Sequence, residues 1–129
     1  MKKRGLTIAI TMLALTTASA WADCRKKINL VPTGAGISKD ISGTAEVRQQ
    51  GTAQKFKVSM DAAVRNGAIF VVKSNGQLAG TLTIQLGSGE LDLNTKDGDT
   101  LPPGVNPVCS ISTLSVSSSS GVTVLNGSF

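Results

Sequence analysis

The sequence predicts an all-β fold: a single antiparallel β-sandwich of about seven to eight strands, preceded by a signal peptide. Several windows carry apolar residues at every second position, as strands with one buried face do. No window beyond residue 22 carries them at helical spacing over three turns. Turn-forming residues separate the windows at intervals of about 8 to 12 residues, as in sandwiches and small barrels. The expected strands are residues 26–31, 43–49, 55–61, 68–73, 81–86, 90–94, 110–116 and 122–129.

The three clearest strands are residues 55–61, 81–86 and 90–94, because their alternation is unbroken. Successive side chains of a strand point to opposite faces, so every second residue is expected to face the core. Lys55 and Lys57 then share the opposite face, and the pleat alone accounts for a solvated position. The residues expected to face the core are Phe56, Val58, Met60, Leu82, Ile84, Leu86, Leu91 and Leu93.

Two other strands depart from simple alternation. Residues 68–72 form a continuous apolar run, which predicts a strand covered on both faces or a central strand of the sandwich. In residues 110–116 the apolar positions change phase along the strand. A bulge near Ser112 or Thr113 would return the later apolar residues to the inward face.

Asparagine, aspartate and glycine pairs mark the expected hairpin turns. These residues accept positive φ at little cost, which two-residue hairpin turns require. The strongest signal, at residues 75–76, should make the strands on either side of it antiparallel neighbours. The three pairs are Asn66-Gly67, Asn75-Gly76 and Asp97-Gly98.

Two further segments are expected to be loops. Residues 101–107 contain three prolines, which cannot pair inside a sheet, so they predict a crossing loop that delivers Cys109 back to the core. Residues 31–36 are rich in glycine but lack the lysine and the following helix of a phosphate-binding loop. We therefore expect an ordinary connection there.

Residues 1–22 have the composition of a signal peptide, so the folded domain is expected to span residues 23–129. A basic start precedes the apolar run 6–15, and small residues then fit cleavage after Ala20 or Ala22. A membrane anchor is the alternative, but the apolar run is shorter than the ~20 residues that span a bilayer. The mature protein is expected to be secreted or periplasmic, without integral membrane insertion.

The mature chain is expected to be close to neutral. The whole sequence has a net charge of +5, but three of its 13 basic residues precede residue 23, which leaves ten against eight acidic ones, or +2. The tightest basic group is residues 25–27, and the sequence has no tyrosine and one tryptophan, Trp21. Without a strong positive field or aromatic side chains to stack on bases, we expect no nucleic-acid partner.

The sequence contains two cysteines, Cys24 and Cys109, which bracket most of the mature chain. An even number of cysteines in an exported protein favours a disulfide. The alternative is a pair of metal thiolates, but the sequence has no histidine to help complete a tetrahedral site. We therefore predict a disulfide between Cys24 and Cys109.

No catalytic constellation is recognisable in the sequence. The absence of histidine removes the usual general base and every Ser-His or Cys-His dyad. Four carboxylates, Glu90, Asp92, Asp97 and Asp99, lie within ten residues and could form an acid–base pair or hold a hard cation. Residues 97–99 lack the pattern of a calcium loop, so a solvated hairpin is favoured, and Asp97 and Asp99 are the candidates if a metal is bound. We assign no catalytic residue and no cofactor.

Short stretches of glycine and strand residues cover most of the mature chain. They are Gly43-Thr44-Ala45-Glu46, Lys55-Phe56-Lys57-Val58, Gly87-Ser88-Gly89-Glu90-Leu91, Gly98-Asp99-Thr100-Leu101-Pro102 and Val124-Leu125-Asn126-Gly127-Ser128-Phe129. Their order resembles small exported bacterial proteins with an Ig-like β-sandwich, a group that implies no assigned activity. The chain is more distantly similar to the sandwiches of copper-zinc superoxide dismutases, but it has none of their histidine ligands. The resemblance therefore implies a fold and no site residues.

Three functions are compatible with these patterns. The favoured one is a non-catalytic exported module that binds a protein, a glycan or a cell-envelope component through loops or an exposed sheet. The second is a structural subunit of a surface fibre or coat, in which an edge strand or residues 23–28 add to a neighbour's sheet. The third is an enzyme that uses the carboxylates of residues 90–99, with or without a cation.

Overall fold

The computed structural model describes residues 23–129. The predicted signal peptide, with its cleavage after Ala20 or Ala22, lies outside the described residues. In the described part, no helix is long and apolar enough to cross a membrane.

Eight antiparallel strands form one continuous sheet in the order β5-β4-β7-β8-β1-β2-β3-β6. This confirms the predicted all-β class, and each expected strand has an observed counterpart. The strands are β1 (Cys24–Pro32), β2 (Ser42–Gln50), β3 (Ala53–Asp61), β4 (Ile69–Ser74), β5 (Gln77–Thr83), β6 (Ser88–Asn94), β7 (Thr113–Ser118) and β8 (Thr123–Ser128). The helical turns are α3 (Gly34–Ser38), η3 (Thr95–Asp97), η4 (Pro103–Val105) and η5 (Val108–Ser110).

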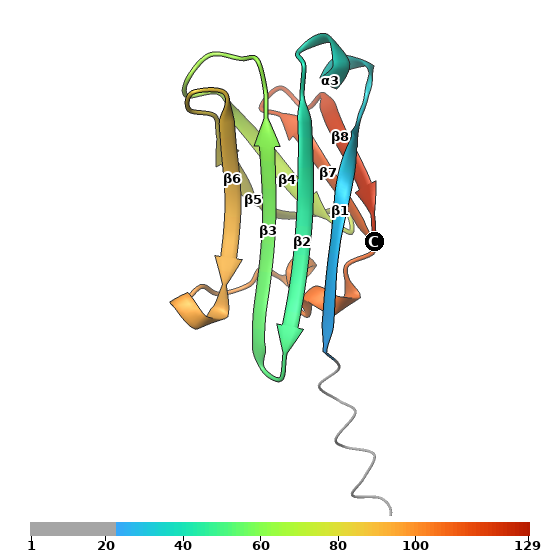
Figure 1. Ribbon diagram of the computed structural model, residues 1–129, viewed down its shortest axis with the longest axis vertical. Coiled ribbons are helices and arrows are strands. Elements are labelled where there is room, and N and C mark those ends of the chain that lie inside the picture. Colours follow the sequence, from blue (N-terminus) through green and yellow to red (C-terminus); the bar gives the residue numbers. More distant parts are fainter. Residues whose placement is uncertain (1–22) are drawn as a thin grey trace, which may run out of the picture.

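The sheet folds into two facing layers and is nearly closed. Figure 1 shows β1, β2, β3 and β6 in front of β5, β4, β7 and β8. Strand β1 joins the layers, because it pairs with β2 along its length and with β8 through Val31 and Pro32. On the opposite side the edge strands β5 and β6 approach each other, and a methyl group added at Gly80 would lie 2.9 Å from Leu91 Cδ2. The Ig-like arrangement of a sandwich stays a prediction.

The core lies between the two layers. Phe56, Val58 and Ile84 are fully buried there, as the alternation predicted. The prediction for Leu86 is wrong: β5 ends at Thr83, and Leu86 lies in the following turn with φ 53° and 91% exposure. Met60 and Leu82 are buried as predicted too, and the other fully buried core side chains are Val47, Val72, Val105, Val108, Val116, Val124 and Leu125.

Strand β4 is a central strand of the rear layer, but only one of its faces is covered. Phe70 and Val72 are buried, whereas Ile69, the first residue of β4, is 48% exposed. Of the two interpretations of the apolar run 68–72, the central strand is confirmed and cover on both faces is wrong.

The predicted bulge near Ser112 or Thr113 is also wrong. Strand β7 begins at Thr113, and Ile111 is buried ahead of it, directly after η5. The change of phase therefore marks the start of the strand, and the register of β7 against β8 shifts later, between Val116 and Ser117.

Of the three expected hairpin turns, the one at Asn75-Gly76 is confirmed. Ser74 pairs with Gln77 across it, and both turn residues have positive φ, 51° and 80°. Gly98 instead ends η3, and residues 66–67 lie in the connection between β3 and β4, which do not pair. Those two hairpin predictions are wrong, because Gly and Asn accept positive φ in any turn, hairpin or not.

Two connections were not expected in their observed form. Residues 51–52 form a two-residue hairpin turn between β2 and β3, with Gln50 opposite Ala53. The expectation of a loop without a helix at residues 31–36 is wrong, because residues 31–32 end β1 and residues 34–38 form α3. Thr33 Oγ1 accepts a hydrogen bond from Gly36 N at 3.2 Å and caps this helix.

The crossing loop 101–107 is confirmed, and a disulfide joins its end to the start of β1. Cys24 and Cys109 are bonded at 2.05 Å between sulfurs, across 85 residues of sequence. Gln54 of β3 also holds the loop: its Oε1 accepts from Val108 N at 2.8 Å and its Nε2 donates to Asn106 Oδ1 at 3.3 Å. The predicted disulfide is confirmed, and it suits an oxidising, non-cytoplasmic environment.

Candidate binding surface

The four carboxylates singled out in the sequence lie along β6 and around η3. Glu90 on β6 forms an ion pair with Lys57 on β3, with 3.8 Å between Nζ and Oε1. Asp99 Oδ2 accepts a hydrogen bond from Asn94 N at 2.9 Å, which closes the turn around η3. Asp97 lies in η3 itself, and Asp92 lies opposite Lys57. Within residues 23–129, no three potential ligands gather as a metal site would require.

The outer face of the β1–β2–β3–β6 layer carries its charges in rows across the strands. One row runs Lys27, Glu46, Lys57 and Asp92, each residue opposite the next in the register. Its charges alternate in sign, so each basic side chain lies beside an acidic one. We call it the mixed row. Opposite charges in directly paired positions stabilise a sheet by about 0.2–1 kcal/mol a pair.

The next row is different, because the three of its residues on β1, β2 and β3 are all basic, and only Asn94 on β6 is uncharged. Arg25 lies opposite Arg48, and Arg48 lies opposite Lys55. We call these three residues the cationic row. Neighbouring strands lie about 4.8 Å apart. This spacing is shorter than the Debye length of about 8 Å at physiological salt, so salt screens the repulsion between adjacent positive charges only in part. Like charges directly opposite each other destabilise a sheet.

Two shallow hollows meet at Arg48, the central residue of the cationic row. On one side, a small hollow of about 20 Å³ is lined by Lys55 and by Lys96 of η3, so a fourth basic residue lies beside the row there. On the other side, a hollow of about 280 Å³ contains Arg25 and Asp23. Asp23 Oδ1 accepts a hydrogen bond from Gly51 N at 2.9 Å. No member of the cationic row forms an ion pair in the described part of the chain.

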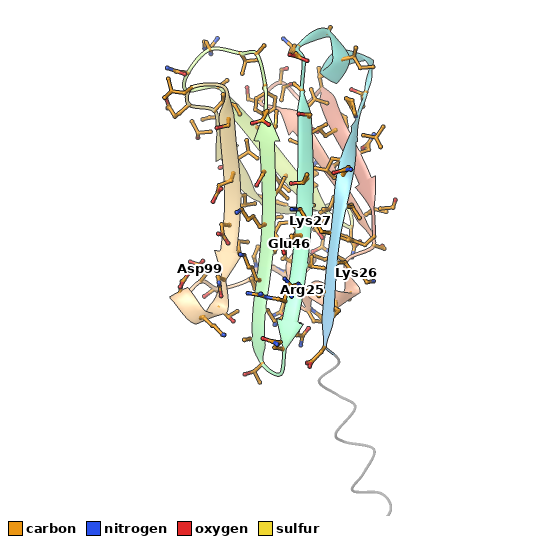
Figure 2. All side chains as sticks on the ribbon, viewed as in Figure 1. Arg25, Lys26, Lys27, Glu46 and Asp99 are labelled. Carbon is orange, nitrogen blue, oxygen red and sulfur yellow. A yellow bond between two sulfur atoms is a disulfide. The ribbon has the colours of Figure 1, made fainter. Side chains whose placement is uncertain are left out.

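The basic group 25–27 is divided between two directions. Arg25 and Lys27 point outward with Glu46, whereas Lys26 has the opposite parity and lies opposite the buried Val47. Figure 2 shows Arg25, Lys27 and Glu46 on the front of the layer, and Lys26 at its β1 edge. The sequence identifies residues 25–27 as a basic group. It does not show that, of these three residues, only Arg25 belongs to the cationic row.

The register of β2 against β3 is what sequence reasoning missed. The alternation of its own strand predicts an ordinary solvated side chain at Lys55. Nothing in that strand indicates that Lys55 lies beside Arg48 of the neighbouring strand. The signal that could have found the pair is the turn at residues 51–52. A two-residue hairpin with Gly at its first position fixes the register and puts Arg48 opposite Lys55.

A second surface feature lies where β1 and β8 separate. Only Val31 and Pro32 of β1 pair with β8, so residues 24–30 have no strand partner on that side within the described residues. A groove of about 900 Å³ opens there. Among the residues that line it are Ile28, Asn29, Val31, Asn126, Gly127 and Ser128.

No protein-family model, curated protein or solved structure matches the chain.

Proposed function

We propose that this protein is a non-catalytic exported module that binds a component of the cell envelope through the outer face of the β1–β2–β3–β6 layer. The cationic row carries the proposal. It places Arg25, Arg48 and Lys55 side by side at a cost in stability, whereas the adjacent mixed row shows that this sheet can also pair opposite charges. A ligand that neutralises these charges would remove that cost.

Three further features support an exported binding module. The disulfide fits an oxidising compartment, as does the predicted signal peptide before residue 23. The Ig-like sandwich that the sequence resembles would present a broad, rigid sheet face to a partner. Glu90 and Asp99 each have a local partner, in Lys57 and in Asn94 N, so the geometry favours binding over the enzymatic alternative.

Purified protein immobilised on a resin is expected to retain envelope material from fractionated cells, and to release it at high salt because exposed charges are screened. The measurement is the composition of the salt eluate, compared with that from protein unfolded by urea under reducing conditions. If the folded protein retains nothing more than the unfolded control from any envelope fraction, the proposed function is wrong.

The groove between β1 and β8 favours a second function, a subunit that assembles by strand addition. An extended segment of a neighbouring copy could pair with residues 28–30, the part of the free edge that carries no charge, and would then lie beside the exposed Val31. A charge at such an edge opposes pairing.

If the protein assembles in this way, Val31→Lys is expected to shift it to the monomer in sedimentation at high concentration. Val122→Lys is the matched control, because Val122 is also exposed but lies in the turn between β7 and β8. A wild-type protein that is monomeric at every concentration would remove this candidate.

A further inference from the structure

We infer that the cationic row binds an anionic polysaccharide, whose carboxylate or phosphate groups pair with Arg25, Arg48 and Lys55. The inference rests on the proposed function and names its ligand class. Arginine presents a planar fork of donors that matches a carboxylate or a phosphate with two parallel hydrogen bonds. Arg48 is half-buried and lies between the two hollows, so its guanidinium is the central contact.

The arrangement of charges fits an extended polymer. The three basic residues lie on successive strands, so they form a line across the layer rather than a closed pocket. Lys96 extends the line beside β6, where it lines the same hollow as Arg48 and Lys55. A linear polyanion that lies across the strands can meet these charges one after another, each about 4.8 Å from the next strand.

Two uncharged polar side chains lie beside the row and suit a sugar chain. Gln50 and Asn94 line the same hollow as Arg48 and Lys55. Amide groups of this kind donate to and accept from sugar hydroxyls. The row therefore offers charge for the acidic groups and neutral partners for the rest of the polymer.

Two other classes of polyanion are less well matched. Single-stranded nucleic acid is held by aromatic side chains that stack on bases, and residues 23–129 contain neither tyrosine nor tryptophan. Phe56, on β3 beside Lys55, is fully buried. Membrane binding needs apolar side chains beside the basic ones, and no exposed large apolar side chain of the described chain lies on β2, β3 or β6.

The decisive experiment measures binding of the full protein to polygalacturonate, a linear polyuronate, and to the same polymer after methyl esterification. Wild-type protein is expected to bind the acidic polymer and not the neutral ester. Arg48→Gln is expected to weaken binding about tenfold, because one charge-assisted contact is lost. Arg48→Lys keeps the charge but not the fork and is expected to weaken binding less. Replacing all three residues of the cationic row by Gln is expected to abolish binding.

Lys57→Gln is the matched control, since it removes one positive charge from the adjacent mixed row, where Glu90 already partners it. It is expected to change binding less than twofold. Thermal unfolding separates lost contacts from lost structure: Arg48→Gln relieves two like-charge pairs and is expected to raise Tm by about 1 to 5 °C while binding falls.

The inference is overturned if the esterified polymer binds as well as the acid, or if Arg48→Gln and Lys57→Gln weaken binding equally. It is also overturned if single-stranded DNA or vesicles of phosphatidylglycerol bind more tightly than polygalacturonate with the same dependence on Arg48. If resin-bound wild type retains envelope material that the triple variant does not retain, but wild type does not bind polygalacturonate, the proposed function stands and the ligand assignment falls. If wild type retains nothing, both fall.

Discussion

A variant without the disulfide, Cys24→Ala/Cys109→Ala, is expected to lose about 4 to 5 kcal/mol of its free energy of unfolding. The bridge spans 85 residues, so it removes a large part of the conformational freedom of the unfolded chain. Small domains have only about 5–15 kcal/mol of stability in total, so the loss would leave a marginal protein. Urea unfolding monitored by far-ultraviolet circular dichroism, in oxidising and reducing buffer, measures it.

The reductant provides the internal control for this experiment. Reduction is expected to destabilise wild type by the same amount as the double substitution and to leave the variant unchanged. A double variant within about 1 kcal/mol of wild type would contradict the entropic account and would mean that the crossing loop is held by its other contacts, including those of Gln54.

Asn75→Ala is expected to destabilise the protein by about 2 to 3 kcal/mol, the second largest effect. Asn75 Oδ1 accepts hydrogen bonds from Ser112 N at 2.9 Å, Ser112 Oγ at 2.9 Å and Thr113 N at 3.1 Å. Its φ of 51° lies in the left-handed region, which costs an alanine about 1–2 kcal/mol. The rest of the loss comes from the hydrogen bonds, at about 1 kcal/mol each and less where water replaces them.

Two further substitutions at the same position separate these contributions. Asn75→Gly tolerates the backbone conformation but loses the hydrogen bonds, so it should be more stable than the alanine variant by about 1 kcal/mol. Asn75→Asp keeps the acceptor and should recover most of the loss. Thermal unfolding of all three variants checks this order, and an alanine variant as stable as the glycine variant would contradict the backbone contribution.

Asn66→Ala is the matched control. Asn66 also precedes a glycine, but its side chain accepts a single hydrogen bond, from Leu86 N at 2.8 Å. It is expected to cost about 1 kcal/mol, so a loss as large as that at Asn75 would contradict the explanation.

The fold could be predicted from the sequence as far as local pattern determines it. Alternation located the strands, since one covered face requires apolar residues at every second position, as at Phe56 and Val58. Pattern alone did not give the ends of strands. Leu86 continues the alternation of β5 beyond Thr83, but the chain turns there to begin β6 on the other layer. Where a strand ends depends on its neighbours, which a single strand's pattern does not contain.

The candidate binding surface was harder to predict, for a related reason. Each basic residue of the cationic row is unremarkable within its own strand, and the row exists only through the pairing of β1 with β2 and of β2 with β3. A shift of one residue in either pairing would turn the side chains of one strand to the opposite face. The net charge of residues 23–129 is only +2, so composition does not reveal this local excess of positive charge.

The close approach of Leu91 to Gly80 has a consequence for solubility. Strands β5 and β6 each have one edge without a paired strand in the described sheet, and exposed edges of this kind recruit other chains into aggregates. Leu91 packs over β5 because position 80 has no side chain, so each edge shelters the other. A bulky residue at position 80 would collide with Leu91, separate the two edges and leave both open to pairing with other chains.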